Sequence, residues 1–324
     1  MPHEAIDTMY TTGSVVGTSK SQSHYVLNQR LGEGAFAVVF SAVRKTDGEP
    51  VAVKVMHLSA LQDLVTVTKE KKQAQLASEI LQDHGLVPRV YESISWRKEK
   101  MLFFAVVMEL LPGLDLCELV DDLWFSDKRM PEPVAALIVR DTTQALHFLH
   151  SANPPMIHRD LKTQNLIVTT EGRVCLCDFG TARQLRASDD AKTYCGTDDM
   201  MAPEMIYGKG HGTALDVWTL GLVAFEVLTL RSPYPIEHWT TARKKAAWRG
   251  GEAPTLPDSH SDHAKAFVHA CLRVTPKQRA TATALLNEPF VAEQRDWAAL
   301  RGELGALEGE VERRVRCAGQ AVHG

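Results

Sequence analysis

The chain has 324 residues, a length at which two lobes or domains are expected because single hydrophobic cores stop growing near this size. Hydrophobic residues make up 44% of the chain, which excludes wholesale disorder. The net charge of -4 provides no bulk attraction to nucleic acid or to an anionic membrane, so we expect no nucleic-acid partner.

The first 24 residues are rich in Ser, Thr and Gly and show no hydrophobic periodicity, so we predict a flexible leader there. They do not resemble a secretory signal. The longest apolar run, residues 102–108, is far short of the about 20 residues that a membrane span requires. We therefore expect a cytoplasmic protein with reduced cysteines and no membrane span, and access to the nucleus stays open.

From residue 25 the pattern changes to short strands around glycines. Residues 25–43, with glycines near the middle, and residues 47–58, which follow an Asp-Gly turn, are typical of β-hairpins. Residues 89–96 and 102–111 predict two further strands, and the polar segment 67–85 predicts a helix ending on a glycine. The first part should therefore be a sheet with one main helix.

After residue 112 the chain becomes mainly helical. Apolar residues recur at helical spacing over 131–151. Residues 213–230 are apolar nearly all round, which predicts a buried helix. We expect short strands within this part, and the fold class is therefore α+β.

The tail, residues 291–324, carries an apolar stripe at spacings of three and four that predicts an amphipathic helix: Trp297, Leu300, Leu304, Leu307 and Val311. Three glycines weaken this helix, and two heptads are too few for a stable coiled coil alone. Docking on the rest of the chain, self-association and folding only on binding all stay open.

The segment around Gly32 and Gly34 points to a ligand. Glycine weakens a strand, and one reason to accept that cost is close approach of the backbone to a bound molecule. The segment leads into a second strand rather than a helix, unlike the dinucleotide fingerprint, and the Walker pattern is absent. Lys54 ends an apolar stretch after this hairpin and would direct a cation at phosphate.

A second concentration of polar groups lies in residues 156–168, where four ionisable side chains occupy positions 158–162 between apolar flanks. Asn165 and, one hairpin later, Asp178 should lie on adjacent strand ends. Mg²⁺ prefers such a sparse set of oxygen ligands, completed by phosphates and water.

Taken in order, Gly32-x-Gly34, the VAVK segment of Lys54, HRDLKTQN at 158–165, DFG at 178–180 and APE at 202–204 resemble the eukaryotic protein kinase family over residues 25–290. The resemblance implies two lobes, a β-rich N-lobe over about 25–111 and a mainly helical C-lobe over about 112–290. Lys162 resembles Ser/Thr kinases rather than tyrosine kinases. No subfamily is assigned.

The resemblance also implies roles for single residues. Asp160 would accept the substrate hydroxyl proton, Lys162 would contact the γ-phosphate, and Asn165 and Asp178 would hold Mg²⁺. ATP would contact the glycine-rich segment, its neighbouring strands and the connection between the lobes: Leu31, Gly32, Glu33, Gly34, Ala35, Phe36, Val39, Ala52, Lys54, Met108, Glu109, Leu111, Asp115 and Ile167. The third glycine of the family pattern is replaced by Ala37.

The acid that pairs with Lys54 is ambiguous. Counting back from His84 by the spacing usual in the family reaches Gln75, while Glu79 and Glu70 lie on either side. We expect Glu79, on the assumption of a shortened connection after the helix. A glutamine at this place would leave Lys54 without its ion pair.

Further expectations concern regulation and substrates. Arg159 would bind a phosphate on the segment after Asp178, with Thr193 as the preferred site for an upstream kinase. Protein substrates would be presented on Thr197–Glu204. Glu204 would pair with Arg279, and Asp216 would cap the catalytic segment.

We therefore expect ATP-dependent phosphorylation of Ser or Thr in proteins. The main alternative is a pseudokinase, a nucleotide-binding or docking module without turnover.

Overall fold

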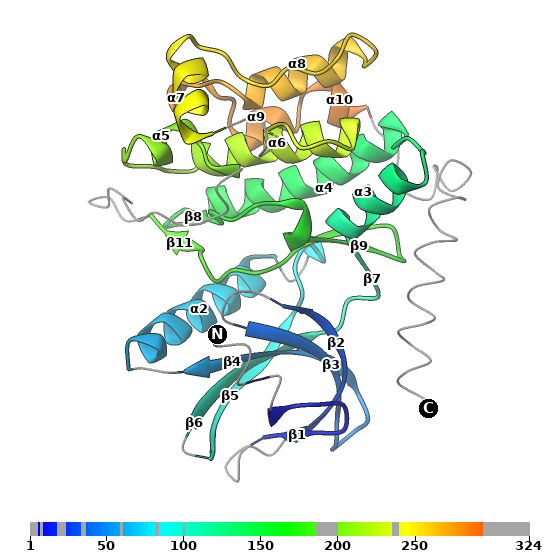
Figure 1. Ribbon diagram of the computed structural model, residues 1–324, viewed down its shortest axis with the longest axis vertical. Coiled ribbons are helices and arrows are strands. Elements are labelled where there is room, and N and C mark those ends of the chain that lie inside the picture. The colour runs from blue at the N-terminus through cyan, green and yellow to red at the C-terminus, as the bar shows by residue number, and fades with distance from the viewer. Residues whose placement is uncertain are drawn as a thin grey trace.

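A computed structural model of the chain describes residues 6, 9–17, 24–33, 37–58, 61–81, 84–99, 101–185, 200–234 and 240–293 (Figure 1). Several expectations lie outside these residues: the contacts of Gly34, Ala35 and Phe36, the phosphorylation of Thr193, the start of the substrate-presenting segment at Thr197 and the helical tail.

The N-lobe is a six-stranded antiparallel sheet in the order β1-β2-β3-β4-β6-β5, with one long helix packed against it. Its elements are β1 (Val15–Val16), β2 (Tyr25–Glu33), β3 (Ala37–Arg44), β4 (Pro50–Leu58), α2 (Leu61–Leu81), β5 (Val90–Lys98) and β6 (Met101–Glu109). The predicted strands are confirmed. The helix begins six residues earlier than predicted and ends before Gly85.

Alternation along β4 separates the two faces of this sheet. Val51, Val53 and Val55 are fully buried on one face, while Ala52 and Lys54 lie on the other. The valine face belongs to an apolar cluster that includes Leu27, Phe40 and Phe103. An antiparallel sheet commonly leaves one face to solvent, so an apolar outer face requires a cover.

The N-terminal residues supply that cover, which corrects the prediction of a flexible leader for residues 9–17. Val15 and Val16 pair with Val26 and Tyr25 as an additional edge strand. Ile6, Tyr10 and Val16 are buried in the cluster on the outer face. Figure 1 shows β1 at the end of the N-lobe furthest from the C-lobe.

The C-lobe is mainly helical, as predicted. Its longer helices are α3 (Leu116–Phe125), α4 (Glu132–Ser151), α6 (Ala214–Thr229), α7 (Thr241–Arg249) and α8 (Asp262–Cys271), and its short ones are α5 (Pro203–Ile206), α9 (Ala282–Leu285) and α10 (Pro289–Ala292). Helix α6 packs between α4 and α8 and is buried along most of its length, which confirms the predicted buried helix.

Short strands cross the C-lobe on the side of the N-lobe (Figure 1). They are β7 (Gly113–Asp115), β8 (Met156–Ile157), β9 (Leu166–Thr169), β10 (Val174–Leu176) and β11 (Arg183–Gln184). Strand β9 pairs with both β10 and β7. Gly113 is required in β7 because a Cβ there would collide with the Val168 carbonyl.

An ion pair is buried where the short helix α5 meets the end of the C-lobe. Arg279 donates from Nη1 and Nη2 to the two oxygens of Glu204, each at 2.7 Å, and the guanidinium lies 5.0 Å from the Trp218 ring centroid. This confirms the predicted pairing. In the described part of the chain, no helix combines the length and apolar character needed to cross a membrane.

Candidate active site

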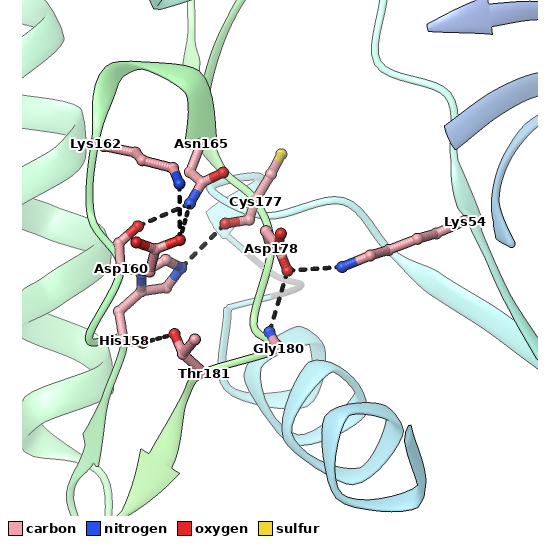
Figure 2. A network of polar contacts seen from close by, with 9 residues as sticks. All are labelled: Lys54, His158, Asp160, Lys162, Asn165, Cys177, Asp178, Gly180 and Thr181. Atoms are coloured by element: carbon pink, nitrogen blue, oxygen red, sulfur yellow. Dashed lines mark hydrogen bonds and ion pairs between the residues drawn. The ribbon is translucent and has the colours of Figure 1, made fainter. Parts of the chain in front are cut away.

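The segment between β8 and β9 brings three predicted site residues together. Lys162 Nζ lies 3.0 Å from Asp160 Oδ2. Asn165 Nδ2 donates to the Asp160 carbonyl at 2.7 Å and to its carboxylate at 3.2 Å (Figure 2). Because both acceptors lie on Asp160, they orient the amide nitrogen toward that residue and direct the amide oxygen elsewhere.

Asp216 on α6 holds the backbone of this segment. Its carboxylate oxygens accept from the backbone N–H groups of His158 and Arg159, each at 2.9 Å, and Oδ2 lies 2.9 Å from His150 Nε2. Burial alone would raise the pKa of the Asp216 carboxyl, but the contacts with His150 and the Arg159 amide lower it. The predicted capping role of Asp216 is confirmed.

Arg159 has a backbone φ of 69°, a conformation that costs energy for a residue with a side chain. Its buried side chain donates from Nε to the Thr181 carbonyl at 2.6 Å. The hydrogen bonds that His158 and Arg159 donate to Asp216 hold the backbone in this turn. They therefore fix the direction of the chain at Asp160.

Asp178 follows β10 and lies beside the catalytic segment. The Cys177 N–H donates to the Asn165 carbonyl at 2.8 Å, and His158 Nε2 donates to the Cys177 carbonyl at 3.0 Å. Asp178 also has a positive φ, of 58°. Asn165 and Asp178 therefore stand on neighbouring chain segments, as the sequence predicted.

Lys54 joins the two lobes. Its ammonium lies 2.8 Å from Asp178 Oδ1, which also accepts from the Gly180 N–H at 3.2 Å (Figure 2). The partial removal of Asp178 from water would raise the pKa of its carboxyl, but the charge and hydrogen bond of Lys54 together with the Gly180 amide lower it to about 2. Asp178 is therefore ionised at neutral pH.

The exposure of Glu79 argues against our expectation that it pairs with Lys54. Glu79 Oε1 accepts from Gln75 Nε2 at 3.3 Å, and both side chains are exposed on α2. The buried face of this helix contains Val67, Ala77 and Leu81. The side chain of Glu70 lies outside the described residues.

The residues predicted to contact ATP pair across neighbouring strands. Gly32 lies opposite Val39, Ala52 opposite Met108, and Asp115 opposite Ile167. Val39 also pairs with Lys54. Glu109 ends β6, with Leu111 two residues later, and Leu31 and Glu33 lie on the exposed part of β2.

Asp115 has a structural contact that the sequence analysis did not anticipate. Its carboxylate accepts from the Glu118 N–H at 2.9 Å and caps α3. An acid just before an apolar helical run is the usual N-cap signal, so the pattern was available in the sequence.

The donor set fits Mg²⁺. It offers an ionised carboxylate at Asp178 and the amide oxygen of Asn165, which its hydrogen bonds direct away from Asp160. Hard oxygen ligands in small number are what this ion accepts alongside phosphate and water.

Glu226 is a titratable group near the site that the sequence analysis missed. It lies on α6 and accepts from Thr163 Oγ1 at 3.3 Å. Burial raises the pKa of its carboxyl to about 7, against which the Thr163 bond acts only weakly. Thr163 and Glu226 are far apart in sequence, so no local pattern marks the contact.

This raised pKa predicts a pH effect on stability. The Glu226 carboxyl holds its proton more tightly in the folded protein than in the unfolded chain, where its pKa is 4.5. The protonated group therefore stabilises the fold fully below a pH of about 4.5, and this stabilisation is lost as the pH rises through about 7. Glu226→Gln should therefore melt about 2 °C or more above the wild type at pH 8 and close to it at pH 4.5. Thermal melts of both proteins and of the exposed control Asp258→Asn test this, and a difference that does not vary with pH would refute it.

Comparison with known families agrees with this geometry. The family model described as the protein kinase domain matches residues 25–291, which is most of the chain and spans both lobes. The matched residues include Lys54 of the N-lobe, the segment of Asp160 and the turn at Asp178. These are the parts of the chain whose contacts make up the candidate site. The chain is a member of the protein kinase family, and its fold is the two-lobed α+β fold of that family.

Proposed function

We propose that this kinase transfers the γ-phosphate of ATP to Ser or Thr hydroxyl groups of protein substrates, with Mg²⁺ as cofactor. The contact between Lys54 and Asp178 carries the proposal, because it places a cation of the N-lobe at an ionised acid of the C-lobe. Phosphoryl transfer depends mainly on such positioning and charge neutralisation.

Each polar group has a separate task. Asp160 would orient the acceptor hydroxyl and take its proton, and Lys162, 3.0 Å from Asp160, would balance charge on the transferred phosphoryl group. Lys54 would bind the α- and β-phosphates. Asp178 and Asn165 would hold Mg²⁺, which when bound neutralises charge on the phosphate oxygens.

The nucleotide would lie between the lobes. Backbone groups of Glu109 and Leu111 would bind the adenine, with Met108 as gatekeeper, and Asp115 would reach the ribose through the oxygen that does not cap α3. Apolar contact with the ring would come from Leu31, Val39, Ala52 and Ile167. The cross-strand pairing of these residues supports this arrangement.

Activation would involve Arg159. Its guanidinium can bind a phosphate bidentately, and phosphorylation of Thr193 by an upstream kinase would supply one. Substrates would lie along residues 197–204. Thr193 and residues 197–199 lie outside the described residues, so the support here is the position of Arg159 beside Thr181.

For the acid that supports Lys54 we propose Glu70. Position 70 is three residues from Val67 and seven from Ala77, both buried, whereas Glu79 is exposed. Since the ion pair of this lysine is needed for the active state, Glu70→Gln should lower kcat/KM at least about tenfold. The matched variant Glu79→Gln should stay within about twofold of the wild type, and steady-state assays of the two proteins distinguish them. A large loss of kcat/KM in Glu79→Gln, with little change in Glu70→Gln, would instead identify Glu79 as the partner of Lys54.

Acceptor specificity tests the proposal. Purified full-length protein is incubated with labelled ATP, Mg²⁺ and peptide pools that differ only in having Ser, Thr or Tyr as acceptor. Label on the Ser and Thr pools is expected, and label confined to the Tyr pool would refute the acceptor class. No transfer by the wild type, with nucleotide still bound, would favour the pseudokinase alternative.

A further inference from the structure

Strand β2, which carries Leu31 and Gly32, does not run regularly beside β3. Leu27 pairs with Ala42 and Arg30 with Phe40, so three steps along β2 match two along β3. One extra residue is therefore accommodated at Asn28 and Gln29, and a second shift of one residue follows between Arg30 and Gly32. A β-bulge of this kind bends a strand and changes the direction of the residues beyond it.

The bulge is held from the side of β3 by Ser41. The Gln29 N–H donates to Ser41 Oγ at 3.0 Å, and Ser41 Oγ donates to the Gln29 carbonyl at 3.2 Å. Ser41 is only 4% exposed. A buried hydroxyl that bonds both backbone groups of one bulged residue replaces the ladder bonds lost there.

The opposite edge of the bulge is held by the N-terminal segment. Thr12 Oγ1 donates to the Asn28 carbonyl at 2.8 Å. At Leu27, the residue before the bulge, the carbonyl accepts from the Gly13 N–H at 2.7 Å and the N–H donates to the Ser14 carbonyl at 2.8 Å. Gly13 has a φ of 86°, which a residue with a Cβ rarely adopts.

The N-terminal segment is itself anchored at the other edge of the sheet. Trp96 Nε1 donates to Tyr10 Oη at 2.5 Å, and the Tyr10 ring meets Phe103 edge to face at 5.2 Å. Lys98 Nζ donates to the Met9 carbonyl at 2.8 Å and lies 4.5 Å from the Tyr10 ring centroid. The segment thus connects β5 and β6 to the bulge in β2, and it lies outside the residues matched by the family model.

We propose that Thr12 and Ser41 are positioning residues for nucleotide binding: together they clamp the bulge at Asn28–Gln29 and set the direction of the glycine-bearing half of β2. The proposal rests on the ATP site proposed above. Beyond the bulge, β2 is exposed from Arg30 to Glu33. The hydrogen bond from Thr12 is therefore the last contact on the outer edge of β2 that the described residues make.

The test uses Thr12→Val and Ser41→Ala in the full-length chain. A net hydrogen bond contributes about 0.5–1.5 kcal/mol, so the KM for ATP should rise about two- to tenfold in each variant with kcat nearly unchanged. Hydrogen exchange of amides 29–32 should become faster. The matched control is Thr229→Val, which removes a 2.8 Å bond to the Phe225 carbonyl in the C-lobe and should move neither quantity.

Ile94→Val serves as a second control, since it removes one buried methylene from the N-lobe sheet away from the bulge. If the clamp variants lower Tm as Ile94→Val does while KM and the exchange of β2 stay at wild-type values, the segment is only structural and the proposal falls. The exchange measurement needs no turnover. Faster exchange with an inactive wild type would therefore keep the clamp and reject the proposed activity instead.

Discussion

Replacing Glu204 by Gln should lower the free energy of unfolding by about 3–5 kcal/mol. The substitution leaves the Arg279 guanidinium without its counter-charge in a buried place, since the Arg279 side chain is 0% exposed and that of Glu204 is 3% exposed. A buried charge that loses its partner keeps the full cost of having left water. Denaturant unfolding of the purified protein measures the change.

Two comparisons make this result specific. Asp47→Asn removes the partner of Arg44 from an exposed pair 2.8 Å apart, and should change stability far less than Glu204→Gln does. The double variant Glu204→Met with Arg279→Met should recover much of the loss, because it leaves no uncompensated charge. A loss below about 1 kcal/mol for Glu204→Gln would contradict the account of this pair.

Replacing Asp178 by Asn should reduce kcat/KM by about 10³-fold or more. The amide carries no charge to attract Lys54, and it is a poorer ligand for Mg²⁺ than a carboxylate. The Asp178 side chain is 42% exposed, so the Tm should fall by only a few degrees and the variant should stay folded. Steady-state assays with saturating ATP and varied peptide concentration measure kcat/KM for the peptide.

The control is Asp258→Asn, a fully exposed acid in the C-lobe. It should have wild-type activity. If Asp178→Asn kept more than about a tenth of the wild-type rate, Asp178 would not hold the metal and the proposed site would have to be rebuilt around other acids.

Much of the fold could be predicted from local patterns. The apolar stretches of β4 and β6 and the apolar character of α6 gave the correct elements because packing there agrees with propensity. The candidate site could also be located in the sequence, since the segment of Asp160 and the turn at Asp178 concentrate polar groups where a core would not.

The N-terminal segment could not be predicted in this way. Its Ser, Thr and Gly content is typical of a linker, and among its described residues it buries three large apolar ones: Ile6, Tyr10 and Val16. Ile6 and Tyr10 are four residues apart, which is one turn of a helix, but Val16 does not continue that spacing. What orders them is the apolar outer face of the sheet, which forms only when strands far apart in sequence have paired.

The acid that pairs with Lys54, among Glu70, Gln75 and Glu79, could not be chosen firmly from the sequence for a related reason. Counting back from His84 assumes a fixed connection after α2, but the face of a helix changes by 100° with each residue. An error of one or two residues in that connection therefore moves an acid from the packed face to the exposed one. The exposure of Glu79 and Gln75 on α2 is therefore what supports the proposal of Glu70.

The most direct test of the central claim is a single-turnover reaction of labelled ATP with the Ser and Thr peptide pools, run with wild-type protein and with Asp160→Asn, in Mg²⁺ and again after chelation. We predict label on peptide only for the wild type with Mg²⁺, and a loss of about 10²-fold or more in Asp160→Asn. Equal transfer by both proteins, or transfer that survives chelation, would contradict the assignment of Asp160, Asn165 and Asp178 to one phosphotransfer site.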